Sequence, residues 1–141
     1  MKNEIFLDFR IVGFEDLTPD DLTRILDIQP FEITIKGERK NPQKPDGKAV
    51  FKNNAWITRS GLDKYSSFED QMNALLDILE PKIHLLRPLC QKYYSEFSCG
   101  LFIYYNNEES TPWVHLNSRY NKIIKELNTE FDIDLYTLPN D

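Results

Sequence analysis

Apolar and polar residues alternate along three stretches of the chain, which is the pattern of a β-strand with one buried face. The apolar positions of the first stretch, residues 4–12, are Ile5, Leu7, Phe9 and Ile11. Residues 31–36 repeat the pattern with Phe31, Ile33 and Ile35, and a last stretch does so with Phe131, Ile133 and Leu135. We therefore expect three half-buried strands, the last with Asp132 and Asp134 on its solvent face.

Three further stretches predict strands of other kinds. Residues 96–105 carry apolar side chains on both faces, as does a strand in the centre of a sheet. Residues 49–59 predict a strand, or a hairpin in which Asn53 and Asn54 form the turn, because asparagine tolerates a positive φ. A short strand is expected over residues 113–116.

Helix start signals precede each helical pattern. The first helix begins after Thr18, whose hydroxyl suits a cap. The main helix is capped by Ser66 or by Ser67, since each is followed three residues later by an acidic residue, as in a capping box. Pro88 must kink or break the second helix that follows, and Asn117 or Ser118 caps the last helix.

The expected element order is β-α-β-β-α(α)-β-β-α-β, which is an α+β fold. A chain of 141 residues has the length of one domain, so we expect a single domain over residues 1–141. The sheet is expected to be mostly antiparallel or mixed, with the helices packed on one of its faces.

Charge is distributed unevenly along the chain. The formal net charge is −6, yet residues 36–59 carry seven basic and only two acidic side chains. An acidic protein repels phosphate backbones, which disfavours general nucleic-acid binding, and its surface suits a basic protein partner. Acidic proteins are nevertheless common, so the negative charge is also explained by an ordinary solvated surface without a binding role.

The cysteines and the N-terminus predict a cytoplasmic protein. Cys90 and Cys99 are expected to be buried free thiols in a reducing compartment. Asp8 and Arg10 interrupt any signal-peptide core, and residues 97–107, an uncharged stretch, are too short to span a bilayer. We therefore expect no membrane association.

Several short patterns, taken in order, resemble one family over roughly residues 5–137. They are Ile11-Val12-Gly13-Phe14, Thr18-Pro19-Asp20-Asp21-Leu22-Thr23, Leu26-Asp27-Ile28-Gln29-Pro30, Lys36-Gly37, Trp56, the helix with Leu75, Leu76, Leu79, Pro81 and Lys82, and Phe131-Asp132-Ile133-Asp134-Leu135-Tyr136. Together they resemble the bacterial domain-of-unknown-function family 4279. The long lysine-rich loop after Gly37 and the proline at Pro88 depart from that family. The resemblance implies a small bacterial domain, and it transfers no catalytic residue. Such domains sometimes act as immunity proteins beside toxins, which is an association only.

Catalytic and metal-binding patterns are weak in this sequence. His84 and His115 lie in different elements without further ligands at metal spacing, so we expect no metal site and no cofactor. Cys99 with His115 is the only conceivable Cys–His couple, and Cys99 is better explained as a core residue. Asp132 and Asp134 could hold a cation or act as acid and base, but a solvent-facing strand explains them equally well.

The basic segment, residues 36–59, is the strongest candidate for a binding site in the sequence. Basic residues interleaved with aromatic ones can bind a nucleic acid or another anion, although a lysine-rich loop is usually only solvated. Tryptophans are common interface anchors, although strand aromatics usually pack in a core. The candidate binding residues are Lys36, Arg39, Lys40, Lys44, Trp56, Arg59 and Trp113.

These observations favour a non-enzymatic domain that binds an unknown protein partner, with an immunity role as one version. Anion or nucleic-acid binding through residues 36–59 is the first alternative. A cryptic enzyme, with a pocket that only the fold would create, is the second.

Overall fold

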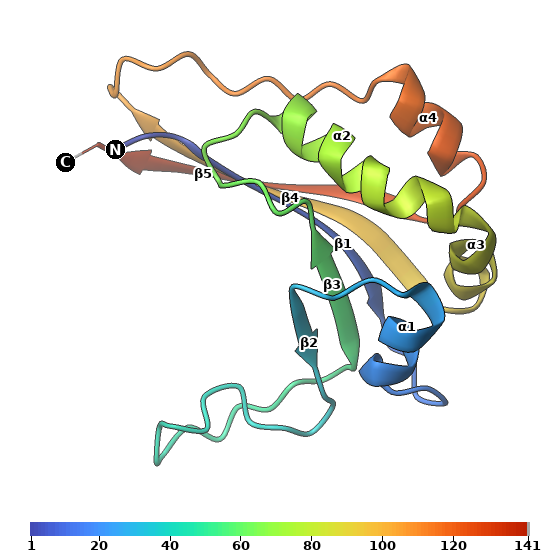
Figure 1. The fold of residues 1–141 in the computed structure, drawn as a ribbon. Helices are drawn as coiled ribbons and strands as arrows, with labels where there is room; N and C mark the ends of the chain where they lie inside the picture. The colour runs from blue at the N-terminus through green and yellow to red at the C-terminus, as the bar shows by residue number, and fades with distance from the viewer. Residues whose placement is uncertain (141) are drawn as a thin grey trace.

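The computed structural model describes residues 1–140 and places a five-stranded sheet beneath a layer of helices (Figure 1). The α+β prediction is confirmed. The elements are β1 (Glu4–Val12), α1 (Pro19–Leu26), β2 (Glu32–Thr34), β3 (Ala55–Arg59), α2 (Phe68–Leu79), the 3₁₀ turn η1 (Glu80–Lys82), α3 (Ile83–Lys92), β4 (Tyr94–Tyr105), α4 (Ser118–Ile124) and β5 (Glu130–Pro139).

The sheet is mixed, and its strand order is β2-β3-β1-β4-β5. β1 pairs antiparallel with both β3 and β4, and β2 pairs antiparallel with β3. β5 instead runs parallel to β4, with the segment containing α4 as the connection between them. β4 therefore lies between two strands, as its two apolar faces predict.

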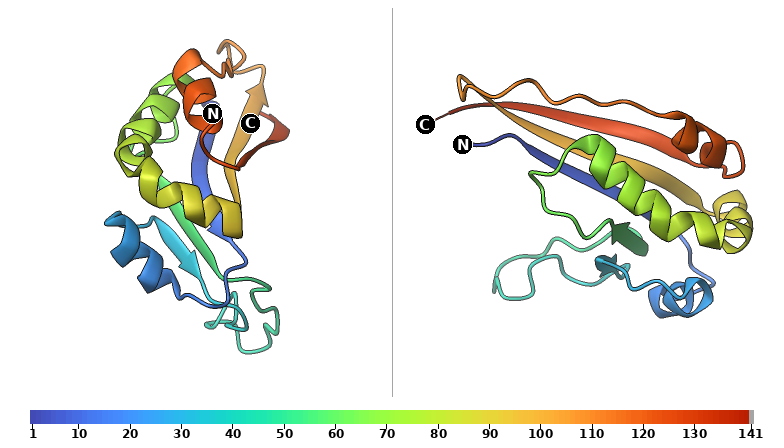
Figure 2. Two further views of the ribbon diagram at one scale, coloured as in Figure 1. Left: turned by 90° about the vertical axis from the view of Figure 1, so that its right-hand side faces the viewer. Right: turned by 45° about the horizontal axis from the view of Figure 1, so that its top comes forward.

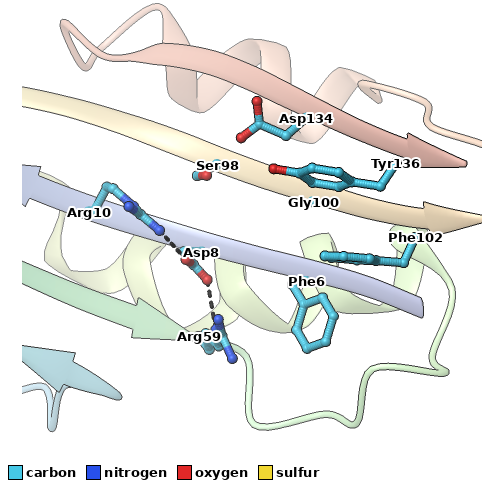
Figure 3. Close-up of a pocket in the computed structure, with 9 residues that line it drawn as sticks. All are labelled: Phe6, Asp8, Arg10, Arg59, Ser98, Gly100, Phe102, Asp134 and Tyr136. Atoms are coloured by element: carbon cyan, nitrogen blue, oxygen red, sulfur yellow. Dashed lines mark hydrogen bonds and ion pairs between the residues drawn. The ribbon is translucent and has the colours of Figure 1, made fainter. Parts of the chain in front are cut away.

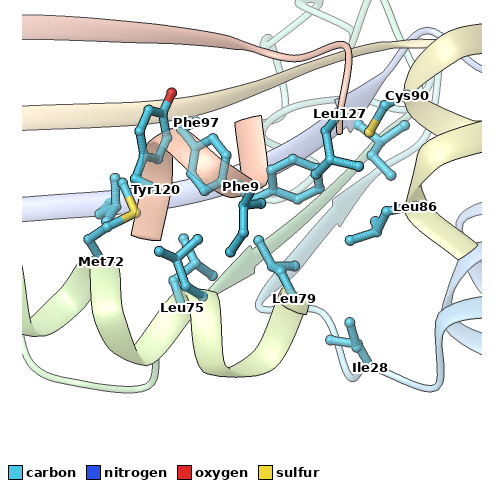
Figure 4. Close-up of a cluster of buried hydrophobic side chains, with 14 of the residues drawn as sticks. Phe9, Ile28, Met72, Leu75, Leu79, Leu86, Cys90, Phe97, Tyr120 and Leu127 are labelled. Carbon is cyan, nitrogen blue, oxygen red and sulfur yellow. The ribbon is translucent and has the colours of Figure 1, made fainter. Parts of the chain in front are cut away.

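The helices lie on one face of the sheet and cover the hydrophobic core (Figure 2). At its centre Phe9 of β1 packs against Phe97 of β4, with ring centroids 5.2 Å apart, and Tyr120 of α4 adds its ring to Phe97 at 5.3 Å. Met72, Leu75 and Leu79 of α2 contribute the opposite wall (Figure 4). Burial of these side chains is the main favourable contribution to folding.

Local capping explains where the helices begin. The Thr18 hydroxyl accepts a hydrogen bond from the Asp21 amide, and the Asp21 carboxylate accepts one from the Thr18 amide, which completes a capping box. For α2 the structure selects Ser67, whose hydroxyl accepts from the Asp70 amide at 3.1 Å. Asn117 caps α4.

Pro88 does not break its helix, which leaves a kink as the expected effect. α3 runs from Ile83 to Lys92 with this proline inside it. Proline leaves the carbonyl four residues earlier, that of His84, without its helical donor. Both Pro88 and His84 are exposed, so water can hydrate that carbonyl.

Two predicted strands are wrong or shortened. Residues 49–59 form no hairpin, because β3 pairs with β1 and β2, and the stretch before it contributes only an isolated bridge between Val50 and Arg39. No strand forms at residues 113–116, which removes one strand from the predicted order. Both corrections have one cause: distant partners decide strand pairing, and alternation alone does not supply them.

The edges of the sheet are more exposed than the alternation predicts. β2 keeps only three residues, and Phe31 and Ile33 are exposed. On β5, Phe131 packs against the core, whereas Ile133 and Leu135 are exposed. The apolar alternation therefore identifies both edge strands correctly. It overstates the burial of their apolar side chains, because the helix layer does not cover the sheet edges.

Candidate functional site

One face of the sheet carries no helix, and we call it the open face (Figure 2). The alternation that sends odd-numbered β1 residues to the core sends Phe6, Asp8 and Arg10 to this face. Across the strands, Asp8 pairs in register with Arg59 of β3 and with Ser98 of β4. The open face is therefore assembled from residues that lie far apart in the sequence.

A buried carboxylate holds two arginines at the centre of the open face (Figure 3). Arg59 Nε donates to Asp8 Oδ1 at 2.7 Å, and Arg10 donates to Asp8 Oδ2. The Asp8 side chain is only 6% exposed, whereas each arginine is about one-third exposed. Arg10 Nε is buried without a hydrogen-bond partner and lies 4.0 Å from Glu96 Oε1. The cluster is therefore an ordered cationic site with unused donor capacity.

Aromatic rings hold the Arg59 guanidinium in place. Its central carbon lies 4.0 Å from the centroid of the Phe31 ring and 5.5 Å from that of Phe6. Arginine stacked on aromatic faces gains cation–π attraction and loses rotamer freedom. Exposed Phe31, which the alternation assigns to a core, therefore acts as a support for this arginine.

A row of three rings borders a shallow hollow beside the arginines (Figure 3). Phe102 stacks on Tyr136 with centroids 4.7 Å apart and meets Phe6 edge-on at 5.6 Å. Small residues of β4, Ser98 and Gly100, form the floor. The hollow has a volume of about 320 Å³ and opens widely to solvent. Small residues surrounded by larger ones create this depression in the side-chain surface of the open face.

The β4–β5 side of the open face is acidic. Glu96, whose side chain is 14% exposed, lies beside the Asp132 carboxyl, and Tyr94 donates to Glu96 at 2.8 Å. Burial and the neighbouring Asp132 carboxyl raise the pKa of Glu96 above its ordinary value. Tyr94 also donates to Glu130 at 3.2 Å, so two carboxyls share one phenol.

The predicted basic segment divides into residues with structural contacts and free lysines. Lys36 Nζ pairs with Glu15 at 2.6 Å, and Arg39 donates to the carbonyls of Gly47 and Lys44 within its own loop. Arg59 belongs to the open face. Lys40 lies over the Phe51 ring at 5.9 Å, and neither Lys40 nor Lys44 has a carboxylate partner in the described chain.

The two predicted tryptophans have different environments. Trp56 is fully buried, and its indole N–H donates to the Thr23 hydroxyl at 3.1 Å, so its ring packs in the core. Trp113 is 64% exposed on the segment between β4 and α4, where it stacks on His115 with centroids 4.9 Å apart.

A nucleophilic role for the cysteines finds no support in their surroundings. Cys90 and Cys99 are free and buried, as expected from the sequence. Burial raises the pKa of the Cys99 thiol to about 12, which keeps it protonated. His115, its conceivable partner, lies stacked on Trp113 at the surface.

The family model for Domain of unknown function (DUF4279) matches residues 3–138. The chain belongs to this family. Comparison with curated proteins and with solved structures finds no match. The resemblance carried by the sequence patterns is thereby confirmed.

Within the part of this DUF4279 domain that the structure describes, no helix has the length and apolar character needed to cross a membrane. Over the same residues, 1–140, no group of three or more His, Cys, Asp or Glu side chains has an arrangement that could hold a metal ion.

Sequence reasoning missed most of the open face. From the sequence, Asp8 and Arg10 are the polar positions of the first strand and Phe102 lies on the second apolar face of residues 96–105. Tyr136 only closes a family pattern, and Phe6 is not singled out. The available signal was that charged and aromatic residues share one parity on the strands, which places them on one face.

Asp8→Asn is expected to lower the free energy of unfolding by about 2–3 kcal/mol. The substitution removes a charge that two half-buried arginines share, and a hydrogen bond to a charged group contributes about 1.5–3 kcal/mol. Urea unfolding followed by Trp56 fluorescence would measure the change. Asp134→Asn, the same substitution at an exposed position, should stay within about 0.5 kcal/mol. Equal effects of the two substitutions would contradict the central role of Asp8.

Glu96→Gln is expected to remove a pH-dependent part of the stability. The pKa of Glu96 is raised in the folded chain, so its contribution is fully present below the unfolded value, ordinarily 4.5, and is lost as pH rises through the folded value. The Tm of the native chain minus that of the variant should therefore fall as pH rises from 4 to 7. In an Asp132→Asn background this fall in the Tm difference should be smaller, because one cause of the raised pKa is gone. A Tm difference that stays constant from pH 4 to 7 would refute the prediction.

Proposed function

We propose that this DUF4279 domain is a non-enzymatic protein-binding domain whose binding surface is the open face. The supporting observation is the ordered set of exposed aromatic and arginine side chains there, in which Phe102 stacks on Tyr136 and Phe31 on Arg59. Aromatic residues and arginine dominate the energetics of protein interfaces. Side chains already held in place lose little entropy when a partner binds.

The shape of the open face favours a large partner over a small substrate. Its hollow is shallow, whereas substrate pockets usually enclose most of their ligand. The residues that line the hollow include Ser98 but no histidine that could act as its base. A protein surface that covers the aromatic row and the arginines together would exclude water from both.

An immunity role is one version of this function, in which the partner is a toxin. Acidic side chains of β4 and β5 suit a partner with a basic surface. Protection of cells that co-express the captured partner would distinguish this version from a scaffolding role.

Capture from native lysate tests the proposed function. The immobilised domain should retain one stoichiometric protein at both low and high salt. Tyr136→Ala and Phe31→Ala, at positions 47% and 58% exposed, should each weaken capture about fivefold or more. Ile25→Ala, 41% exposed on α1 in the helix layer, is the matched control and should leave capture unchanged. Empty capture, or equal capture by all four chains, would refute the proposal.

Anion binding through the loop between β2 and β3 is the second candidate. Lys40, Lys44, Lys48 and Lys52 are exposed on this projecting loop (Figure 1). Lys40, Lys52 and Phe51 line a hollow of about 390 Å³ at its base. A cationic hollow with one aromatic wall suits a phosphate-bearing strand.

The salt dependence of oligonucleotide binding tests this candidate. Affinity for a labelled single-stranded DNA should fall with salt, and Lys40→Gln/Lys44→Gln/Lys48→Gln should reduce the slope of log K against log salt by about 2. Lys122→Gln/Lys125→Gln, which removes two charges on the α4 side, should not change that slope. Binding that is absent, or indifferent to all of these lysines, removes the candidate.

A further inference from the structure

β5 is an edge strand whose outer side has no partner. It stands at one end of the strand order and pairs with β4 over its whole length, from Glu130 to Pro139. No backbone hydrogen bond joins it to any other segment of the described chain. About half of its N–H and C=O groups therefore point outward, ready to pair with an added strand.

This edge has few of the features that protect an edge strand. Proteins block edges with short strands, charged side chains (lysine above all), prolines or bulges, and β5 has only the charges of its three carboxylates. The opposite edge, β2, has only three residues. β5 has ten, contains no lysine, carries its one proline at the last position, and keeps an unbroken register with β4. A long, regular edge whose only protection is negative charge can accept a strand of complementary charge.

The side chains of β5 alternate between two kinds of surface. Glu130, Asp132 and Asp134 lie on the open face and are exposed. Ile133 and Leu135, 48% and 58% exposed, lie on the helix side, opposite Cys99 and Leu101 in register. A strand added to this edge would place its own alternating side chains beside these two rows.

A second copy of the chain is a poor occupant of this edge. An antiparallel β5–β5 pair centred on the acidic half of the strand would set Asp132 beside Asp134 of the other copy. Like charges on neighbouring strands destabilise pairing. The charge of the edge therefore selects a basic strand.

We propose that β5 accepts an extended segment of a partner protein in which basic and apolar residues alternate. The proposal rests on the protein-binding function proposed above and deepens it. Basic side chains of the segment face Glu130, Asp132 and Asp134, and its apolar side chains cover Ile133 and Leu135. Backbone hydrogen bonds supply the pairing, and alternation supplies the specificity.

The segment between β4 and α4 offers a separate exposed ring. Residues 106–117 connect these two elements, and Asn117 at the end of the segment donates to Glu69 of α2. This segment carries Trp113, whose ring is held flat on His115 and is largely exposed. An aromatic side chain of this kind gives a partner a large contact area at low entropic cost.

Peptide binding tests the inference directly. The probe is a seven-residue peptide of alternating lysine and valine with blocked ends. The control peptide has the same composition, with the lysines first and the valines after them. The alternating peptide should bind roughly tenfold more tightly, because only it can match both rows at once. Equal affinities would reduce the effect to net charge and overturn the inference.

Charge reversal locates the binding. Asp132→Lys/Asp134→Lys should weaken binding of the lysine–valine peptide roughly tenfold and create affinity for the matching glutamate–valine peptide. Glu38→Lys/Asp46→Lys makes the same change in net charge on the exposed loop between β2 and β3, and it should change the affinity for neither peptide. Amide hydrogen exchange should slow at alternate β5 residues when the peptide binds. Slowing elsewhere with β5 unchanged would refute strand addition.

The captured partner separates the two proposals. If the native chain captures a protein that slows amide exchange at alternate β5 residues, and Asp132→Lys/Asp134→Lys loses that protein, the strand-addition inference is supported. If the reversed chain captures the same protein as well as the native chain does, the inference fails while the protein-binding function stands. A native chain that forms a dimer at pH 7 through β5 would also overturn it, because the occupant would then be a second copy.

Discussion

The two-residue period of β1 is the constraint on which the rest of the structure depends. Leu7 and Phe9 reach the centre of the core, while Asp8 between them reaches the centre of the open face. A slip of one residue in the pairing of β1 would drive Asp8 into the core and expose Phe9. Burial of the core residues thereby fixes the register that brings Asp8 to Arg59. The same nine residues stabilise the fold and assemble the site.

Much of the fold could be predicted because its signals are local. The strand at residues 4–12, the caps at Thr18 and Asn117, and the central position of β4 all follow from neighbouring residues. The one-sided helix layer follows from the polar face of β1, which a second helix layer could not bury. The family could also be recognised, because its patterns keep their order along the chain.

The rest depends on contacts between distant residues. Arg59 belongs by sequence to a basic segment, yet pairing with β1 places it on Asp8, 51 residues away. Phe31 alternates like a core residue, but β2 lies at the edge, where the ring stacks on that arginine instead. Trp56 and Trp113 have the same chemistry and opposite burial, which only the position of the helix layer decides.

The strand order also separates the charges of the domain. The loop with Lys40 and Lys44 joins β2 and β3 at one edge, and Asp132 and Asp134 lie on β5 at the other. Between them, Asp8 offsets only one of its two arginines, so the centre keeps a small positive charge. Electrostatic attraction is screened within roughly 10 Å at 0.1 M salt, so each edge acts on a different part of a partner. Charge then sets the orientation of approach, whereas the aromatic row and the β5 backbone provide contacts that salt does not weaken.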